Sequence, residues 1–371
     1  MVRMIVRLLA LTSALAAAAS AAGSNAARYE AASRERTFAA SAPDVTAPLA
    51  PPPRLGGVPL MGSTGLRLLV ANNPPFLLDV DTGRRTRIRG LDVRGHAVLS
   101  VLAVGKDAIV WLDRAPLTRR VPRAEIYVLR HGRTSATRLA TAWQVAPAAD
   151  GAGVWLTSYR DGRHCTLREV ALDGRQLRSP RPVACSTQLI DAGGSALLVQ
   201  GNSVVDPETR RTLLRSGGVW ARAGHFVLTA ADVQGPLTLT DLRTGARSRF
   251  RYPSQIGGQG GRDQAVVEPR GERMALSFSD PAYELSGTQV TDVWLLETSN
   301  RRLQQLPDMP AAVRLKFTSM SWTSDGRLVF LAETHQDEVV AVWRPGQKRI
   351  AVRRVRLPAR NSGSDSFVVW P

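Results

Sequence analysis

The strongest constraint on this chain is a repeat. A short apolar run, a tight turn with Gly or a polar pair, and a second strand recur about seven times. The turns are Asp81-Thr82-Gly83, His131-Gly132, Asp173-Gly174, Glu208-Thr209, Thr244-Gly245, Ser299-Asn300 and Pro345-Gly346. A period of about 40 to 55 residues indicates that each copy is one supersecondary unit and that neighbouring copies share a core. The repeat therefore predicts an architecture before any single residue predicts a chemistry.

Residues 57–371 accommodate seven copies of about 45 residues, the length of a four-stranded propeller blade. In the third copy, apolar runs and turns predict strands at 142–146, 153–158 and 165–172, and a fourth that begins at Arg175. No segment keeps apolar residues at a spacing of about 3.6, so few helices are expected. The sequence predicts an all-β fold, a β-propeller of seven four-stranded blades.

The end of the chain predicts how the ring closes. Residues 366–370 resemble 141–143 and 319–322, which are expected to begin the innermost strands of their blades. We expect this C-terminal strand to complete the first blade, whose other strands follow from Leu66. A shared position near the starts of innermost strands favours packing between blades over stacking on a ligand for four tryptophans: Trp143, Trp220, Trp322 and Trp370.

The N-terminal segment is not part of the repeat. Arg3 and Arg7 precede an apolar run of 12 residues at 8–19 and then small residues, the pattern of a secretory signal. The run is short for a membrane span, which needs about 20 residues, although an uncleaved anchor is the alternative. We expect a signal peptide at 1–22, a disordered Ala/Pro/Ser-rich tether at 23–56 and the propeller at 57–371. The protein would be exported: secreted, periplasmic or attached to the cell wall, with no integral span beyond that signal.

The two cysteines, Cys165 and Cys185, fit an exported protein. They flank the Asp173-Gly174 turn, so a hairpin closed there would place them on adjacent strands. We expect a disulfide between them, and two unpaired buried thiols are the alternative.

The net charge of +18 predicts attraction to anionic surfaces. Only three of the 49 basic residues are lysines, and the arginines are spread over every repeat. Many fall in the short, basic fourth strands, as at 84–89 and 349–356, where charge on an exposed edge blocks pairing with another molecule. We therefore expect no nucleic-acid binding.

Two stretches resemble a known repeat signature. Residues 321–328, Ser-Trp-Thr-Ser-Asp-Gly-Arg-Leu, resemble the W-S-P-D-G-R-x-hydrophobic signature of TolB-like, WD-repeat-related propellers. Residues 267–273 are a weaker copy, and 292–298 resemble the D-x-W/Y strand that follows in those repeats. The resemblance implies a propeller in which the Asp-Gly or Arg-Gly pair forms a hairpin turn. Relatives bind proteins, sugars or peptides and some are enzymes, so the resemblance implies no single function.

The sequence holds no recognisable catalytic or metal motif. No two of the five histidines lie within five residues of each other, which excludes a local H-E-x-x-H site. The segment 79–83 begins like a calcium loop but lacks the later ligands, and is expected to form only a turn. The Gly-rich segment 257–261 lacks the Lys-Ser/Thr of a phosphate loop and is expected to connect two blades. We expect no cofactor and no metal.

Loops that join second to third strands, with those between blades, are expected to open on one face of the ring. Long loops in a repeat protein are the usual places for recognition. We expect a polar ligand or a protein to bind through polar residues of these loops, the alternative being that they are merely solvated. The candidates are Asn73, Asp113, Arg114, Arg119, Arg120, Tyr159, Arg160, Asp161, Asp280, Tyr283, Glu284, Glu333 and His335.

The sequence therefore predicts a monomeric binding module of the cell envelope. Its expected partner is an envelope protein, a peptide or an anionic polysaccharide. Two alternatives remain open. One is a propeller lyase or hydrolase acting on polysaccharide or peptide, to which Glu284, Glu333 and His335 would contribute; the other is a structural envelope protein held by charge.

Overall fold

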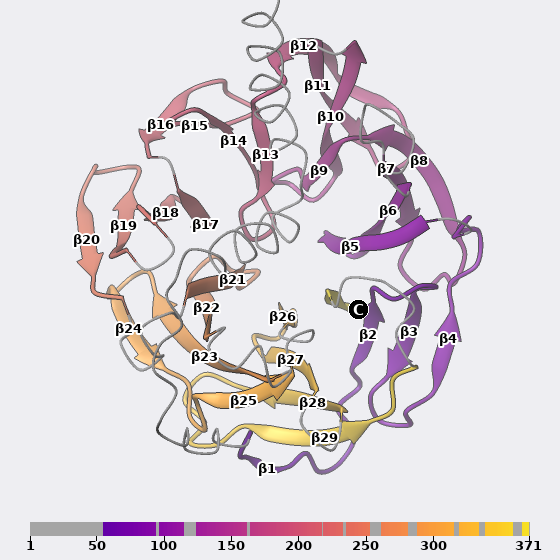
Figure 1. Cartoon of the computed structure of the whole chain (residues 1–371), viewed down its shortest axis with the longest axis vertical. Helices are drawn as coiled ribbons and strands as arrows, with labels where there is room; N and C mark the ends of the chain where they lie inside the picture. Colours follow the sequence, from indigo (N-terminus) through magenta and orange to yellow (C-terminus); the bar gives the residue numbers. More distant parts are fainter. Residues whose placement is uncertain are drawn as a thin grey trace, which may run out of the picture. The chain divides into compact units, whose positions relative to one another are not determined.

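The structure is a computed structural model. It describes residues 55–93, 96–114, 124–161, 164–216, 218–232, 235–252, 261–280, 288–314, 319–333, 338–358 and 366–370. The chain divides into two units, residues 1–51 and 52–371, and every described residue belongs to the second. These residues form seven sheets, each built on four antiparallel strands, that stand as blades around a ring (Figure 1). The all-β, seven-bladed propeller is confirmed.

The first strand of each blade lies nearest the centre of the ring (Figure 1). From blade 1 to blade 7 these strands are β30 (Phe367–Trp370), β5 (His96–Val104), β9 (Gln144–Pro147), β13 (Gln188–Asp191), β17 (Val219–Ala223), β21 (Gly261–Val267) and β26 (Ser319–Trp322). Blade 1 takes its innermost strand from the C-terminus of the chain, as predicted.

The second and third strands form the buried middle of each blade, because both of their faces pack on neighbouring blades. The second strands are β2 (Arg67–Val70), β6 (Asp107–Arg114), β10 (Gly153–Asp161), β14 (Ala196–Gln200), β18 (Phe226–Ala230), β22 (Arg273–Asp280) and β27 (Leu328–Glu333). The third strands are β3 (Phe76–Asp79), β7 (Ala124–Leu129), β11 (His164–Ala171), β15 (Ser203–Val205), β19 (Leu237–Asp241), β23 (Thr288–Glu297) and β28 (Glu338–Trp343). Burial on both faces explains why these segments read as continuous apolar runs.

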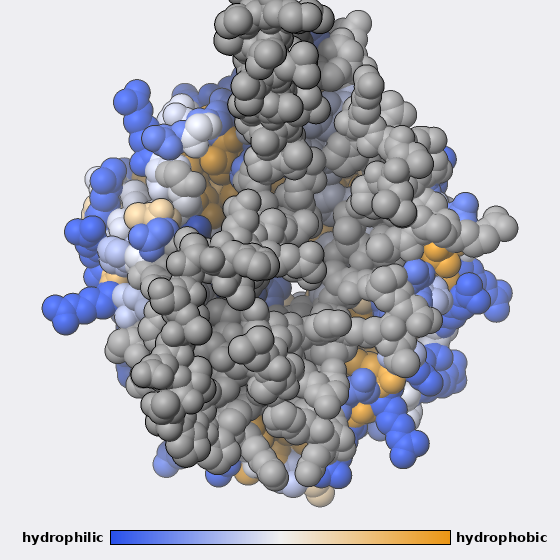
Figure 2. Space-filling model, viewed as in Figure 1, coloured by the Kyte–Doolittle hydropathy of each residue, from blue (hydrophilic) through white to orange (hydrophobic). Residues whose placement is uncertain are grey.

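The fourth strands lie at the rim of the ring. They are β4 (Arg85–Arg87), β8 (Ala136–Ala142), β12 (Gln176–Ala184), β16 (Thr212–Arg215), β20 (Arg247–Phe250), β24 (Arg302–Gln305) and β29 (Ala351–Val355). Hydrophilic side chains gather over this rim, for example above β4 and β20 (Figure 2). The expectation that all fourth strands are short is wrong for β12, which extends over nine residues.

Two further strands were not foreseen. β25 (Ala311–Arg314) pairs with residues 288–291, the first part of β23. β1 (Val58–Pro59) pairs in parallel with β29, so that the outer edge of blade 7 is covered by a preceding part of the chain. A two-residue segment without regular alternation carries no sequence signal for such pairing, which is why it was missed.

All seven predicted turns join third to fourth strands. In blade 1, Asp79 Oδ1 accepts a hydrogen bond of 2.8 Å from the backbone N of Thr82, and Gly83 has a φ of +70°. The signature at 321–328 forms the β26–β27 hairpin, where Gly326 has a φ of +78°. A left-handed φ strongly favours glycine, and this explains its place in both turns.

The aromatic member of the D-x-W/Y strand is held by the acid before it. In β23, Trp294 Nε1 donates to Asp292 Oδ2 at 2.8 Å. A second copy occurs in β7, where Tyr127 OH donates to Glu125 Oε2 at 2.8 Å. Burial raises the pKa of Asp292 more than its hydrogen bonds with Gln305, Trp294 and the backbone of Val293 lower it. The motif therefore satisfies buried polar groups within a blade.

The tryptophans of the innermost strands mostly pack between blades, as predicted. Trp370 packs among buried residues of blades 1 and 2, and Trp322 among those of blades 6 and 7. Trp220 packs against a cluster shared by blades 5 and 6. The expected position near the start of an innermost strand is wrong for Trp322 and Trp370, which are the last residues of their strands.

Polar side chains link the innermost strands of successive blades. Each accepts a hydrogen bond from a backbone N–H of the next innermost strand. The pairs are Gln144 Oε1 with Leu189 N (2.9 Å), Gln264 Oε1 with Met320 N (2.9 Å), Ser321 Oγ with Val369 N (3.2 Å) and Ser366 Oγ with Val101 N (3.2 Å). Backbone groups that would otherwise be unpaired at the sheet edges are satisfied in this way.

The ring closes through β30, which pairs with β2 along its whole length, from Phe367 opposite Val70 to Trp370 opposite Arg67. Ala71 N also donates to Ser366 O at 2.8 Å. The predicted closure is confirmed.

A polar cluster joins blades 7 and 1 at the outside of the same seam. Asp81 follows β3 and accepts hydrogen bonds from Thr64 N at 2.8 Å and Gly65 N at 2.8 Å. Arg353 of β29 pairs with Asp81 and donates to the backbone oxygen of Gly62 at 2.6 Å. Burial raises the pKa of Asp81, but the hydrogen bonds from Thr64, Gly65 and Ser63 outweigh it and hold the pKa well below its ordinary value. Asp81 therefore does more than form the predicted turn.

Removal of the closing strand should destabilise the whole ring. Deleting 366–371 leaves the β2 edge unpaired, and Trp370→Ala alone should lower the free energy of unfolding by about 3–5 kcal/mol, as for other buried tryptophans. Chemical denaturation would measure both. Deleting Pro371 alone is the control, and unchanged stability after deletion of 366–371 would contradict closure by this strand.

Asp81→Asn should lower the free energy of unfolding by about 1–3 kcal/mol at pH 7, because it removes a charged acceptor from several donors. The folded-state pKa lies below the ordinary value of 3.8. The stabilisation by wild-type Asp81 is therefore complete above that value and is lost as pH falls below it. Denaturation at pH 7, 5 and 3 should show the difference in free energy of unfolding between variant and wild type narrowing only at pH 3.

Asp173→Asn is the matched control, since that carboxylate accepts one turn hydrogen bond, from Arg175 N. Its effect should stay below about 0.5 kcal/mol. An Asp81→Asn deficit of the same size at pH 3 and pH 7 would refute the electrostatic explanation.

Candidate functional site

The predicted recognition residues lie where second strands lead into third strands. Asp113 and Arg114 end β6, Tyr159, Arg160 and Asp161 end β10, Asp280 ends β22, Glu333 ends β27, and Asn73 lies between β2 and β3. The second strands of all blades point the same way along the axis of the ring, so their ends lie on one face. We term this face the mouth. Arg119, Arg120, Tyr283, Glu284 and His335 lie outside the described residues.

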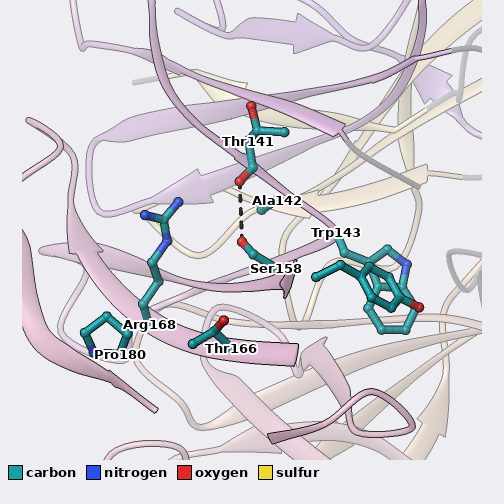
Figure 3. Close-up of a pocket in the computed structure, with 8 residues that line it drawn as sticks. Thr141, Ala142, Trp143, Ser158, Thr166, Arg168 and Pro180 are labelled. Atoms are coloured by element: carbon teal, nitrogen blue, oxygen red, sulfur yellow. Dashed lines mark hydrogen bonds between the residues drawn. The ribbon is translucent and has the colours of Figure 1, made fainter. Parts of the chain in front are cut away.

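Among these candidates, the side chains of Asn73 and Tyr159 are described, and they belong to blades 1 and 3, with blade 2 between them. Tyr159 borders a cavity of about 390 Å³ between blades 2 and 3 (Figure 3), which we term the blade 2–3 groove. Its lining residues are Thr141, Ala142, Trp143, Ser158, Tyr159, Thr166, Arg168 and Pro180.

Along the strands of blade 3 that face blade 2, apolar side chains give way to polar ones toward the mouth. The groove lies at this polar end. On the face of blade 3 that meets blade 2, Val154 and Leu156 of β10 pack with buried residues of β7. The next residue on that face of β10 is Ser158.

The same change occurs on the neighbouring strand. In β11, Val170 belongs to the apolar layer, and Arg168 and Thr166 follow it on the same face. Ser158 lies opposite Thr166, and Leu156 lies opposite Arg168. Two polar rows therefore replace the core at the mouth end of this interface.

Among the described residues that line the groove, Arg168 is the one cation. Its Nε atom is buried and has no hydrogen-bond partner among the described residues. Arginines nearby are paired: Arg178 Nε lies 2.7 Å from Glu169 Oε2, and Arg138 lies 3.3 Å from Glu125 Oε1. A buried donor left without an acceptor costs about 1–3 kcal/mol. Arg168 therefore carries a hydrogen-bond donor that no described residue uses.

Hydroxyl groups and an aromatic pair complete the groove. Ser158 Oγ donates to Thr141 O at 3.4 Å, and the Arg168 side chain extends beside this contact in the view of Figure 3. The rings of Trp143 and Tyr159 lie 4.7 Å apart between centroids. Burial raises the pKa of the Tyr159 phenol. Trp143 therefore differs from the other inner tryptophans, because it borders a cavity.

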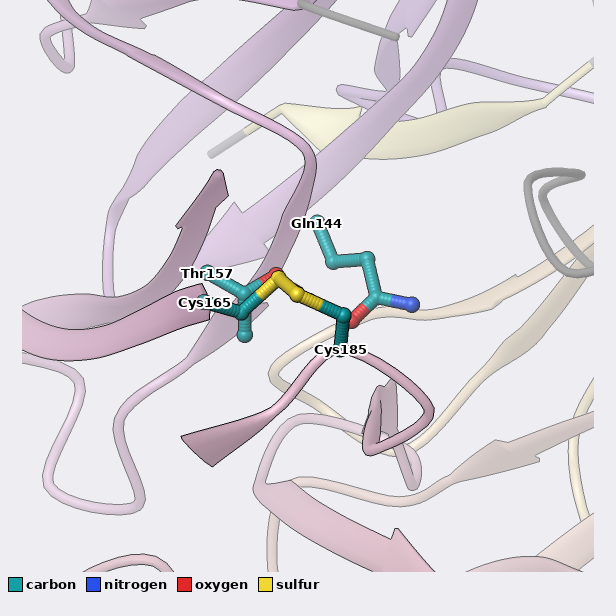
Figure 4. The surroundings of a disulfide bond; sticks show 4 residues. All are labelled: Gln144, Thr157, Cys165 and Cys185. Atoms are coloured by element: carbon teal, nitrogen blue, oxygen red, sulfur yellow. A yellow bond between two sulfur atoms is a disulfide. The ribbon is translucent and has the colours of Figure 1, made fainter. Parts of the chain in front are cut away.

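A disulfide fixes the strand that carries the groove residues. Cys165 and Cys185 are bonded, as predicted, with their Cα atoms 5.0 Å apart (Figure 4). Cys165 precedes Thr166 in β11, and Cys185 directly follows β12. Nearby, Gln144 Oε1 accepts from Thr157 Oγ1 at 3.1 Å as well as from Leu189 N (Figure 4). Blades 3 and 4 are thus joined beside the groove.

Two acidic side chains of innermost strands have raised pKa values. They are Asp263 in blade 6 and Asp191 in blade 4, and the pKa shift is upward for both. Both side chains are exposed. They belong to different blades and neither lines the groove, so they do not form a catalytic pair.

Within the described ranges, no three His, Cys, Asp or Glu side chains gather closely enough to hold a metal ion. The same part of the chain contains no helix that is long and apolar enough to cross a membrane.

No protein-family model matches the chain, and no curated protein matches its sequence. Solved structures resemble its fold. The β-propeller domain of the trilobed protease from Pyrococcus furiosus, described as having an open velcro topology, gives a TM-score of 0.50 at 11% identity and covers 83% of this chain and 99% of that one. Prolyl oligopeptidase B from Galerina marginata, bound to a macrocyclization substrate, gives 0.51 at 10% identity and covers 83% of this chain and 51% of that one. TolB from Acinetobacter baumannii gives 0.48 at 11% identity and covers 84% and 68%.

These likenesses concern the fold alone. The chain spans about half the length of the prolyl oligopeptidase, and its own β30–β2 pairing contrasts with the open topology described for the trilobed protease domain. The signature at 321–328 remains a resemblance.

The sequence pattern alone does not single out Arg168, Ser158 or Thr166. A signal existed, because these polar residues interrupt otherwise apolar rows of a second and a third strand. It could be recognised only once the pairing of β10 with β11 was known, since either residue alone is ordinary in a strand.

Loss of the disulfide should destabilise the propeller. The bond closes a segment of sequence separation 20, for which chain entropy predicts a loss of about 3 kcal/mol in Cys165→Ala/Cys185→Ala. Denaturation of wild type with and without reductant provides the comparison. The reduced wild type and the double variant should agree, and a loss below about 0.5 kcal/mol would show that the bond is dispensable.

Proposed function

We propose that the protein is an exported binding module of the cell envelope that recognises a polar ligand or a protein at the mouth of the propeller. In this proposal residues 1–22 are a signal peptide, 23–56 a tether and 57–371 the propeller. The basic start, the apolar run and the disulfide support export.

The observation that carries the proposal is the blade 2–3 groove. It combines an unpaired arginine, hydroxyl groups and aromatic rings beside the second-to-third-strand connection of blade 3. Ligand sites are concave and place a few polar groups within an otherwise apolar lining. Arg168 has no structural partner among the described residues, so a role in binding accounts for it better than a role in stability.

The proposed partner is an envelope protein, a peptide or an anionic polysaccharide, bound by a monomer. The longer loops that follow β6 and β22 would enlarge the contact beyond the groove, through Arg119 and Arg120 and through Tyr283 and Glu284. The net charge of +18 would bring anionic partners toward the surface.

Retention of envelope components by the immobilised full chain tests this proposal. Arg168→Gln, Arg119→Ala/Arg120→Ala and Tyr283→Ala/Glu284→Ala should each lower retention about five-fold or more, as for interface residues worth at least about 1 kcal/mol. Retained components would be quantified by mass spectrometry at physiological salt.

Arg175→Gln is the matched control, because it removes one charge from an exposed turn of the same blade at the end away from the mouth. Equal retention by every variant would refute a mouth site. Retention that falls uniformly with salt and ignores all variants would instead support a structural protein held by charge.

A further inference from the structure

We infer that the blade 2–3 groove binds a sugar acid, a ring that carries one carboxylate and several hydroxyl groups. This inference rests on the proposed binding function and names the ligand class for its central site. It follows from the charge, the donors and the shape of the groove.

The charge of the groove suits a single carboxylate. Among the described residues of the lining, Arg168 is the only basic one and none is acidic. Guanidinium groups bind carboxylates through two parallel N–H bonds, and the buried, unpaired Nε of Arg168 is one such donor. One cation balances a monoanion, whereas a phosphate dianion would need further cations or backbone donors. The groove therefore favours a carboxylate.

The remaining lining suits a hydroxyl-bearing ring. Ser158, Thr166 and Thr141 bring hydroxyl groups, each of which can both donate and accept. Sugar hydroxyls have the same dual capacity, so the two sets can satisfy each other. The Trp143–Tyr159 pair supplies an apolar surface at the same site, against which the C–H face of a sugar can pack. A simple carboxylate such as acetate would leave these groups unused.

The size of the groove limits the ligand further. A cavity of about 390 Å³ is near the lower end of the range of about 300–1,000 Å³ for ligand pockets. This volume suits one sugar residue or the end of a chain. Thr141 Oγ1 already accepts a hydrogen bond of 2.9 Å from Arg138 Nη2, which fixes that side of the groove before any ligand enters.

Isothermal titration of the full chain with D-glucuronate tests the inference. The comparison ligands are glucose, which lacks the carboxylate, acetate, which lacks the ring, sulfate, which is a different anion, and an acidic tetrapeptide. Wild type and Arg175→Gln should bind glucuronate equally and more tightly than all four comparison ligands.

Variants of the groove should test the recognition of the carboxylate and of the sugar ring separately. Arg168→Gln should weaken glucuronate binding about ten-fold or more, and Arg168→Lys should not restore it, because lysine lacks the planar fork. Ser158→Ala should weaken glucuronate binding several-fold while leaving any acetate binding unchanged, and it tests the site even if Arg168→Gln fails to fold.

Several outcomes would overturn the inference: no glucuronate binding, equal binding of glucose, acetate or sulfate, tighter binding of the peptide, or no effect of either groove variant. The two proposals can fail separately. If glucuronate binds as expected but no envelope component is retained, the proposed function is wrong. If retention depends on Arg168 but glucuronate does not bind, the function stands and the ligand class is wrong.

Discussion

The pairing of β30 with β2 is the constraint on which the rest of the structure depends. A blade cannot bury its two faces unless it has neighbours on both sides, so an open ring would expose two apolar surfaces. By supplying the innermost strand of blade 1 from the C-terminus, the chain continues from its last blade into the sheet of its first blade. Ser321 and Ser366 then connect β30 to the innermost strands of blades 7 and 2. Every interface between blades, including the one that holds the groove, requires this closure.

The groove illustrates how a repeat scaffold can carry a site without a catalytic motif. Val154 and Leu156 already belong to the apolar layer between blades 2 and 3. The packing of these two blades therefore does not depend on Arg168. The polar rows can then vary at the mouth end without disturbing that layer. The disulfide and the hydrogen bonds of Gln144 hold β11 and the adjoining blade in place. A binding group placed on rigid strands loses little freedom when a ligand arrives.

The sequence was sufficient for the fold because its signals are local. Apolar runs with turn residues between them predicted the blades, the outer turns and the closing strand, and the turn at Gly174 predicted the disulfide. What it could not supply were contacts between distant residues. Gln144 bonds to a residue 45 positions away and Gln264 to one 56 positions away. Arg168 becomes notable only once β10 and β11 are aligned and its neighbours are known to be apolar. Of the predicted recognition residues, the structure places many at the mouth but describes the side chains of only two.

The pairing of β1 with β29 and the polar cluster around Asp81 have a mechanical consequence. A force applied at residue 55 would reach the ring at the outer edge of blade 7, through two parallel residue pairs and the bonds of Arg353 and Asp81. The β30–β2 pairing lies on the inner side of the same seam and would not be the first to bear that load. A force on the N-terminal side would therefore break the β1–β29 pairing and the contacts of Arg353 and Asp81 first, and the ring would stay intact.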